Sequence, residues 1–139
     1  MSIDIKVRRG VDIKLVGEAG KVNGELSPSE TYVVKPSDFH EVVPKLLVAE
    51  GDEVLAGTPL FYSKDNDRIR FTSPVSGEVA EIKRGEKRKI LEIKILADKE
   101  VRYETFNPGA SSELNKEKVT EALLGAGLWP MLRQRPYDV

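Results

Sequence analysis

The chain has 139 residues, of which 40% are hydrophobic and 32% are charged, and its formal net charge is −1. This length fits one domain with a short extension, and the apolar content is ordinary for a folded protein, which excludes general disorder. The balanced charge excludes a general nucleic-acid-binding protein, which needs a basic surplus to displace counterions. Because the sequence holds no cysteine, disulfides, thiolate nucleophiles, zinc–thiolate sites and iron–sulfur ligation are excluded within this chain.

Residues 1–30 predict two N-terminal strands followed by a loop. Apolar and polar residues alternate over residues 3–7 and again over residues 11–15, which is the period of a strand. Residues 17–28 are rich in glycine and polar residues and indicate a loop. No stretch has the apolar core of a signal peptide or the ~20 apolar residues of a membrane-spanning helix. Any association with a membrane is therefore expected to go through a partner.

Residues 31–104 form the predicted central domain, which consists of short strands separated by turns. Strands are expected close to residues 32–34, 46–48, 54, 60–62, 69–71, 79–82 and 91–95. A polar hairpin tip is expected at residues 64–68. A short repeat relates residues 48–52 to residues 82–86 and would place two strand–turn–strand units about a pseudo-dyad axis. The turns are expected to use the backbone freedom of Gly51, Gly57, Gly77 and Gly85.

Residues 105–139 predict a C-terminal helical extension, because the apolar spacing changes here from strand-like to helical. Asn115 is the expected N-cap, and Gly125 or Gly127 is the expected end of the helix. Pro130 would open a second short helix at its first position, where the missing N–H costs nothing. The abrupt end of the chain indicates that the extension leads into a missing remainder of a longer protein.

The segment from Val48 to Leu60, followed by Ser73-Pro74-Val75-Ser76-Gly77, resembles the lipoyl and biotinyl carrier domains. This resemblance implies a mainly β, barrel-sandwich hybrid fold, here with N-terminal strands and a small C-terminal α-helical segment. Carriers of this class attach their cofactor to a lysine at a hairpin tip. Counting back along the pattern from Gly77 places Asn66 at that position, with Lys64 in a different register, so the resemblance predicts the carrier fold without the carrier lysine.

Three ordered segments resemble the A-subunit family of the sodium-translocating NADH:quinone oxidoreductases. They are Arg9-Gly10-Val11-Asp12-Ile13-Lys14-Leu15, then Ser73–Gly77 with Arg84-Gly85-Glu86-Lys87-Arg88, and finally Gly127-Leu128-Trp129-Pro130-Met131-Leu132-Arg133-Gln134-Arg135-Pro136. The last segment is the most specific, because it combines a tryptophan, two arginines and a proline at fixed spacing. Proteins of that family are several times longer than this chain.

This second resemblance implies a soluble subunit of a respiratory complex, held peripherally by partner subunits on the cytoplasmic side of the bacterial inner membrane. Such a complex oxidises NADH, reduces quinone and exports Na⁺, and it uses NADH, flavins, an iron–sulfur centre and quinone. The present chain would bind none of these, would be inactive alone, and would act as a scaffold and docking module. Any contact with quinone would belong to the full-length protein.

Two other functions remain open at this point. One is a C-subunit-type protein of the related electron-transport complex, which continues into a nucleotide site and cysteine-rich clusters. The other is an unmodified carrier or adaptor domain.

No catalytic, cofactor-binding or metal site is expected in this chain. His40 is the single histidine and has no cysteine or second histidine to join it as a metal ligand. The carboxylate pairs Glu50/Asp52 and Asp65/Asp67 lie in predicted turns, which are wet, whereas an acid–base pair needs a pocket that shifts one pKa.

Two groups of residues are candidates for contact with other subunits: Arg84, Gly85 and Lys87 in a basic turn, and Trp129, Arg133 and Arg135 near the C-terminus. The basic turn could bind an acidic partner, a cofactor phosphate or lipid headgroups. It is not a phosphate-binding loop, because the multiple glycines and the helix start are missing. Tryptophan and arginine are favoured interface anchors, although Trp129 could equally pack within its own chain.

Overall fold

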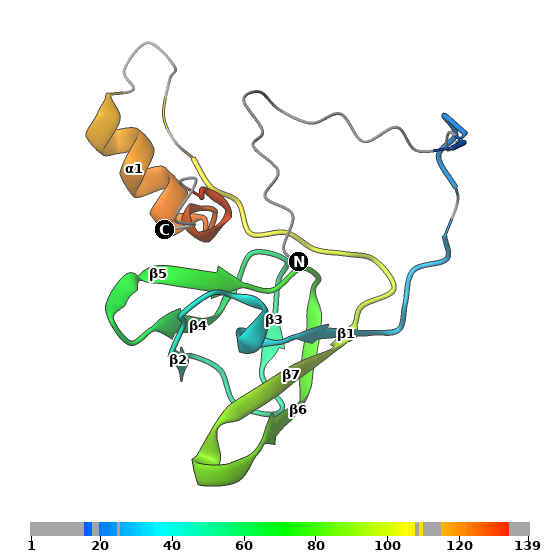
Figure 1. Ribbon diagram of the computed structural model, residues 1–139, viewed down its shortest axis with the longest axis horizontal. Coiled ribbons are helices and arrows are strands. Elements are labelled where there is room, and N and C mark those ends of the chain that lie inside the picture. Colours follow the sequence, from blue (N-terminus) through cyan, green and yellow to red (C-terminus); the bar gives the residue numbers. More distant parts are fainter. Residues whose placement is uncertain (1–15, 18–19, 25, 108, 110–114, 134–139) are drawn as a thin grey trace, which may run out of the picture.

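The computed structural model describes residues 16–17, 20–24, 26–107, 109 and 115–133 (Figure 1). The elements follow in the order β1 (Thr31–Val34), the 3-10 turn η1 (Pro36–Asp38), β2 (Pro44–Leu46), β3 (Glu53–Val54), β4 (Pro59–Ser63), β5 (Asn66–Thr72), β6 (Gly77–Arg84), the 3-10 turn η2 (Glu86–Arg88), β7 (Ile90–Ala97), α1 (Lys116–Gly125) and the 3-10 turn η4 (Trp129–Met131). The chain is therefore mainly β with one small helix, as predicted. The strands predicted at residues 3–7 and 11–15 lie outside the described residues.

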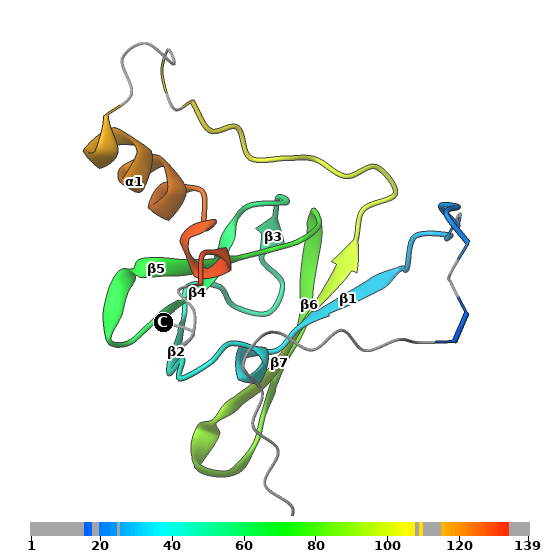
Figure 2. The same ribbon diagram turned by 45° about the horizontal axis from the view of Figure 1, so that its top comes forward.

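The strands form two antiparallel sheets that enclose the core. One sheet has four strands in the order β1-β7-β6-β3, and the other has three strands in the order β2-β4-β5. β6 and β7 are the longest strands, and Figure 2 shows their hairpin running past the end of the second sheet. The sandwich thus carries a projecting two-stranded ribbon.

Alternation along β7 explains which side chains enter the core. Ile93 and Ile95 are fully buried, whereas Glu92 and Lys94, which alternate with them, point to the outer face. Leu60 and Phe61 break this rule, because both are fully buried although they are consecutive in β4. A register irregularity in the pairing of β4 with β5 at this point allows both side chains to face inward. Burial of each large apolar side chain contributes roughly 1.5–3 kcal/mol.

Three phenylalanines form an aromatic cluster inside the sandwich. The rings of Phe61 and Phe71 are stacked with their centroids 4.7 Å apart. The ring of Phe39 is tilted against Phe71 at 4.4 Å and stands edge-on to Phe61 at 6.1 Å. Phe39 comes from the chain between β1 and β2, so the cluster fastens this connection to the second sheet.

The outer face of the four-stranded sheet is covered by cross-strand ion pairs. Glu92 on β7 lies between Lys35 and Lys83, with N–O distances of 3.6 and 3.8 Å. Lys94 on β7 pairs with Glu81 on β6, and the hydrogen bond between them lowers the pKa of Glu81 and raises that of Lys94. Such exposed pairs add little stability, but they neutralise this face locally.

The turn from Ser73 to Gly77 packs directly against the end of β7. A Cβ atom at Gly77 would lie 1.9 Å from the carbonyl oxygen of Leu96, which no side chain tolerates. The hydroxyl of Ser76 is fully buried and accepts a hydrogen bond of 2.8 Å from the backbone N–H of Arg102. The close approach therefore requires glycine at position 77, and the buried hydrogen bond accounts for the serine at position 76.

The segment that follows β7 runs back across two turns of the sandwich and acts as a strap. Ala56 donates its N–H to the carbonyl of Arg102, and Glu104 donates its N–H to the carbonyl of Ala56, both at 2.9 Å. The hydroxyl of Thr58 donates to the carboxylate of Glu104 at 2.9 Å. The strap, residues 98–104, thus joins distant turns by backbone hydrogen bonds.

Two predicted boundaries in the second sheet are wrong. The strand expected at residues 46–48 is β2 and begins at Pro44, which an edge strand tolerates because the missing N–H need not pair. The hairpin tip expected at residues 64–68 is shorter: only Lys64 and Asp65 form the turn, and Asn66 already pairs with Ser63. Asn66 therefore does not occupy the tip. A register shift in β5 absorbs the residues that the sequence pattern assigned to the turn.

The predicted repeat does not extend to backbone conformation. Gly51 has a φ of +90°, a conformation that favours glycine, whereas Gly85 has a φ of −102°. At the second turn the positive φ values fall instead on Lys87 and Arg88, at +53° and +61°. The two turns therefore share a sequence pattern but differ in backbone conformation.

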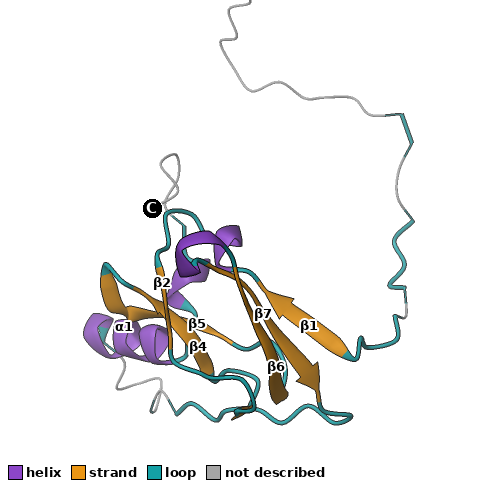
Figure 3. Cartoon of the chain, turned by 90° about the horizontal axis from the view of Figure 1, so that it is seen from below, coloured by secondary structure: helices purple, strands orange, loops and turns teal. Residues whose placement is uncertain are grey.

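The C-terminal extension forms α1 and η4, which lie against β5 (Figure 3). The predicted caps are confirmed: the side chain of Asn115 accepts a 2.9 Å hydrogen bond from the N–H of Lys118, and Gly127 follows the helix with a φ of +67°. The N–H of Leu128 closes this end on the carbonyl of Leu123 at 2.9 Å. Pro130 is the second residue of η4 and not the first, because Trp129 already belongs to that turn.

Replacing Gly77 by valine should lower the free energy of unfolding by about 3 kcal/mol or more, because the Leu96 carbonyl must move. Gly51→Ala is a matched control, since Gly51 also has a positive φ but has open space around its Cβ position. That control should cost only about 1–2 kcal/mol. Urea unfolding of both variants measures the difference, and equal losses would contradict the close approach at Gly77.

Asp98 should make stability depend on pH. Hydrogen bonds from the Ser76 hydroxyl and then from Arg102 hold the pKa of its carboxyl below the ordinary value of 3.8. Because the folded state favours the carboxylate, Asp98 stabilises the fold fully above about pH 5. This stabilisation is lost as the pH falls through the pKa of the carboxyl in the folded state, which lies below 3.8. Asp98→Asn should therefore unfold at lower urea than the parent protein at pH 7, and the difference should shrink as the pH is lowered from 5 to 3. Glu100→Gln, at an exposed neighbour, should match the parent protein at both pH values.

Candidate functional site

The basic turn predicted at residues 84–88 is the tip of the β6–β7 hairpin. Arg84 ends β6, and the turn closes through hydrogen bonds from Gly85 N–H to the carbonyl of Lys89, at 2.8 Å, and from Lys89 N–H to the carbonyl of Glu86, at 3.1 Å. Lys87 and Arg88 both have left-handed backbone conformations, which cost about 1–2 kcal/mol for each side chain other than glycine. The tip is therefore a defined turn that carries local strain.

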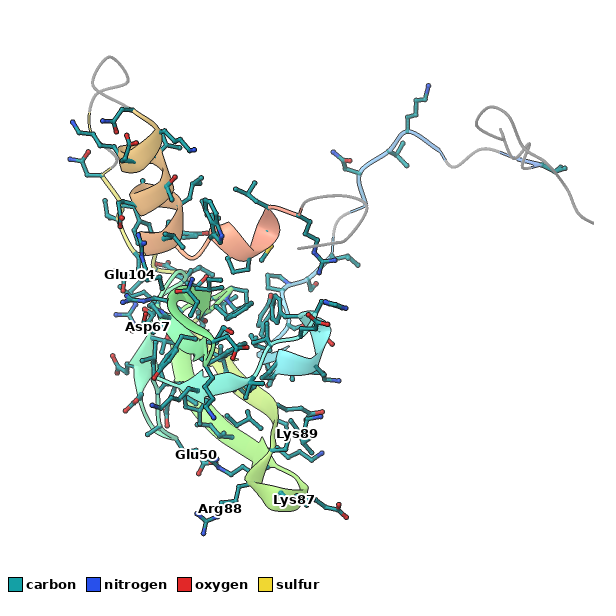
Figure 4. All side chains as sticks on the ribbon, turned by 60° about the vertical axis from the view of Figure 1, so that its left-hand side comes forward. Glu50, Asp67, Lys87, Arg88, Lys89 and Glu104 are labelled. Atoms are coloured by element: carbon teal, nitrogen blue, oxygen red, sulfur yellow. The ribbon has the colours of Figure 1, made fainter. Side chains whose placement is uncertain are left out.

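Two further basic residues belong to this tip that the sequence-based candidates left out. Figure 4 shows Lys87, Arg88 and Lys89 together at the end of the hairpin, with Glu50 beside the ribbon. Arg84, Lys87, Arg88 and Lys89 are exposed, and no ion pair joins any of them to another residue within the described part of the chain. The run of basic residues in the sequence was the signal for Arg88 and Lys89. These four cations together are called the basic tip below.

The second candidate group lies at the other end of the molecule. Trp129 is half-buried in η4, which packs against β5 and α1, and Arg133 is exposed just after it. Leu128, Met131 and Leu132 leave 52%, 66% and 56% of their surface exposed, so η4 presents an apolar patch. Arg135 lies outside the described residues. The structure therefore does not bring the two candidate groups together (Figures 1 and 2).

Gly127 determines how the C-terminal group meets the sheet. A Cβ atom at this position would lie 2.4 Å from the side chain of Thr72 at the end of β5. Arg68 of β5 forms an ion pair with Glu121 of α1. The helix is thus held by a close approach at one end and an exposed ion pair along its side.

A shallow hollow of about 310 Å³ lies beside the strap and is lined by Glu53, Val54, Leu55, Thr58, Arg102 and Glu104. Three of its four polar side chains already have partners. The Thr58 hydroxyl binds the Glu104 carboxylate, and Arg102 binds Asp98 with a nitrogen–oxygen distance of 3.0 Å. The Glu53 carboxylate is exposed and has no partner among the described residues, and no second unpaired acid, base or nucleophile lines the hollow beside it.

The remaining titratable candidates support turns. The carboxylate of Glu50 accepts a 2.7 Å hydrogen bond from Ile82 N–H, and that of Asp52 accepts one of 2.8 Å from Ala49 N–H. His40 is exposed, with Nδ1 4.0 Å from the carboxylate of its neighbour Glu41. Among the described residues, no group of three or more histidine, aspartate or glutamate side chains could hold a metal ion. Within the same part of the chain, no helix is long and apolar enough to cross a membrane.

Comparison with protein families matches residues 5–98 to the NqrA N-terminal barrel-sandwich hybrid domain. This match, together with the two sheets, confirms the predicted barrel-sandwich hybrid fold. Within this fold the β4–β5 hairpin differs from the prediction, since Lys64 lies in its turn and Asn66 does not.

Relatives of known name share similarity along nearly the whole chain. The chain is 34% identical over 136 residues to the A-subunit of the Na(+)-translocating NADH-quinone reductase from Hahella chejuensis. It is 33% identical over 135 residues to the protein of the same name from Marinomonas sp., and 33% identical over 136 residues to that from Neisseria meningitidis. Each alignment covers 96% of this chain but 30% of the relative, so the chain spans about 30% of the length of these proteins.

Proposed function

Because the chain belongs to the NqrA N-terminal barrel-sandwich hybrid domain family, we propose that it works within the A-subunit of a Na⁺-translocating NADH–quinone reductase. In this proposal the complex couples NADH oxidation and quinone reduction to Na⁺ export. The domain lies on the cytoplasmic side of the bacterial inner membrane and is held there by other subunits. NADH, flavins, the iron–sulfur centre and quinone are bound elsewhere in the complex.

The proposed role of the domain itself is that of a scaffold and docking module without catalytic groups. The observation that carries this role is the use of its polar side chains by its own backbone. Glu50, Asp52 and Ser76 each accept a backbone N–H, so their oxygen atoms hold turns in place. Groups engaged in this way are poorly placed to act as acids, bases or nucleophiles.

The two separated candidate groups are the proposed contact surfaces. The first consists of Arg84, Gly85 and Lys87 at the hairpin tip, and the second of Trp129 and Arg133 with Arg135 beyond the described residues. The exposed apolar side chains of η4 suit contact with a folded neighbour, since clustered apolar surface marks interaction sites. Two surfaces at opposite ends suit a module that holds neighbours in position.

A tagged full-length protein that contains this domain is expected to co-purify with the other subunits of the reductase. The domain alone is expected to show no oxidation of NADH. Gly77→Val within the full-length protein should weaken co-purification, because it destabilises the domain. Lys116→Gln, at an exposed position of α1, is the matched control and should co-purify normally. Failure of the unaltered protein to associate with any other subunit would refute the proposal.

A second function, that of a swinging-arm carrier, is favoured by one observation. Lys64 and Asp65 form the turn of the β4–β5 hairpin, so a lysine is present at the tip of this hairpin. Its neighbours in the turn and in β5 are acidic or polar: Asp65, Asn66 and Asp67.

Intact-mass measurement of the protein from its native source separates the two functions. The scaffold proposal expects the mass of the unmodified chain. An added mass that peptide mapping places on Lys64, and that Lys64→Arg removes, would instead establish the carrier function.

A further inference from the structure

Along the β6–β7 ribbon, ion pairing stops at the basic tip. Along the same ribbon, Lys83 pairs with Glu92 and Lys94 pairs with Glu81. Elsewhere, Arg102 pairs with Asp98 and Arg68 with Glu121. Beyond Lys83 the ribbon adds four exposed cations, which have no ion-pair partner within the described residues, and the single acidic residue Glu86. Since the whole chain has a net charge of −1, this is a local concentration of positive charge and not part of a basic surface.

The backbone of the tip presents two of these cations at a cost to the fold. Lys87 and Arg88 adopt φ values of +53° and +61°, where glycine would be unstrained. The connection needs a left-handed conformation, but it does not need lysine and arginine to supply it. Strain of this kind is commonly retained where the side chains have a function.

We propose that the basic tip, Arg84, Lys87, Arg88 and Lys89, docks on an acidic surface of another subunit, formed by clustered aspartate and glutamate side chains. This inference rests on the proposed function, since it assumes the multisubunit reductase, and it specifies the chemistry of one contact. The projecting shape of the ribbon suits insertion between side chains of a neighbour (Figures 2 and 4). Complementary charge at such a contact selects the partner and accelerates association.

A bound phosphate fits this tip less well than carboxylates do. Phosphate-binding loops cradle the anion with free backbone N–H groups. Here the N–H groups of Gly85 and Lys89 are already used to close the turn. The tip therefore offers mainly side-chain cations on a projecting turn, and two of its backbone N–H groups are not available to an anion.

A lipid surface also fits less well. Attraction to anionic headgroups depends on the number of cations, and stable attachment usually adds an apolar anchor. The residues from Arg84 to Lys89 carry no apolar side chain, and Glu86 lies among the cations. A fixed turn with one carboxylate in its middle matches a particular arrangement of charges on a protein.

The test measures binding of the full-length protein to the reductase complex that lacks it, by biolayer interferometry over a range of salt concentrations. The variant Lys87→Gln/Arg88→Gln/Lys89→Gln should bind about tenfold or more weakly at low salt, with a smaller dependence on salt. The matched control Lys99→Gln/Lys116→Gln/Lys118→Gln removes the same charge from exposed positions elsewhere and should bind as the unaltered protein does. Equal binding by both triple variants would overturn the inference.

Arg88→Gly separates binding from folding. It removes one cation and relieves the left-handed strain, so Tm should rise by roughly 2–5 °C while binding weakens. Weaker binding with a higher Tm cannot come from a damaged fold. A higher Tm with unchanged binding would count against a role of Arg88 in the contact.

The remaining outcomes distinguish the possible failures. If the unaltered protein does not bind the complex, the proposed function fails and the inference falls with it. If the tip variant binds the complex as tightly as the unaltered protein does, the proposed function stands and the acidic contact is wrong. The last measurement is flotation with phosphatidylglycerol vesicles. If the unaltered protein binds the vesicles and the tip variant does not, while both bind the complex equally, the basic tip is assigned to the membrane surface and the acidic contact is wrong.

Discussion

The whole arrangement depends on the backbone of Gly77 lying against the carbonyl of Leu96, with 1.9 Å between that oxygen and the place where a Cβ would be. This contact brings the beginning of β6 onto the end of β7. It also places the buried hydroxyl of Ser76 where the N–H of Arg102 can reach it. Because the strap starts immediately after β7, its course across Ala56 and Thr58 follows from the same approach. A single residue without a side chain therefore determines how the two ends of the sandwich are fastened.

That fastening also explains the chemical character of the domain. A sandwich of this size has few polar groups inside, and the turns that close it must satisfy their backbone N–H groups. Here carboxylates and hydroxyls of the turns do so, as Glu50 does for Ile82 and Asp52 for Ala49. The same oxygen atoms cannot also be preorganised for a reacting group. The side chains left over for function are those on the surface, and the two groups proposed as contacts there consist of cations and apolar side chains.

The sequence predicted the elements that depend on local chemistry and missed those that depend on distant contacts. The alternation of apolar and polar residues was sufficient to predict β6 and β7. The two ends of α1 were predicted from Asn115 and Gly127. The position of the β4–β5 turn did not follow, because a register shift hides which residues of β5 pair. The strap was not predicted either, since the hydrogen-bond partners of residues 98–104 lie far away in sequence. For the contact residues, the run of basic residues in the sequence indicated the tip. Only the structure shows that these cations have no ion-pair partner within the described residues.

The strain at the tip can persist because the ribbon beneath it is strongly determined. β6 and β7 pair along their full length and place Val79 and Ile95 in the core, so the hairpin cannot shift its register without exposing buried side chains. The ladder therefore imposes the left-handed conformation on whichever residues reach the turn. Glycine at both positions would remove the strain, yet the chain has a lysine and an arginine there and has its glycine earlier, at Gly85, where the φ of −102° does not require one. A Cβ atom at Gly85 would lie 3.1 Å from the side chain of Leu91, so the glycine at this position is explained by packing. The presence of Lys87 and Arg88 is explained instead by what the tip contacts.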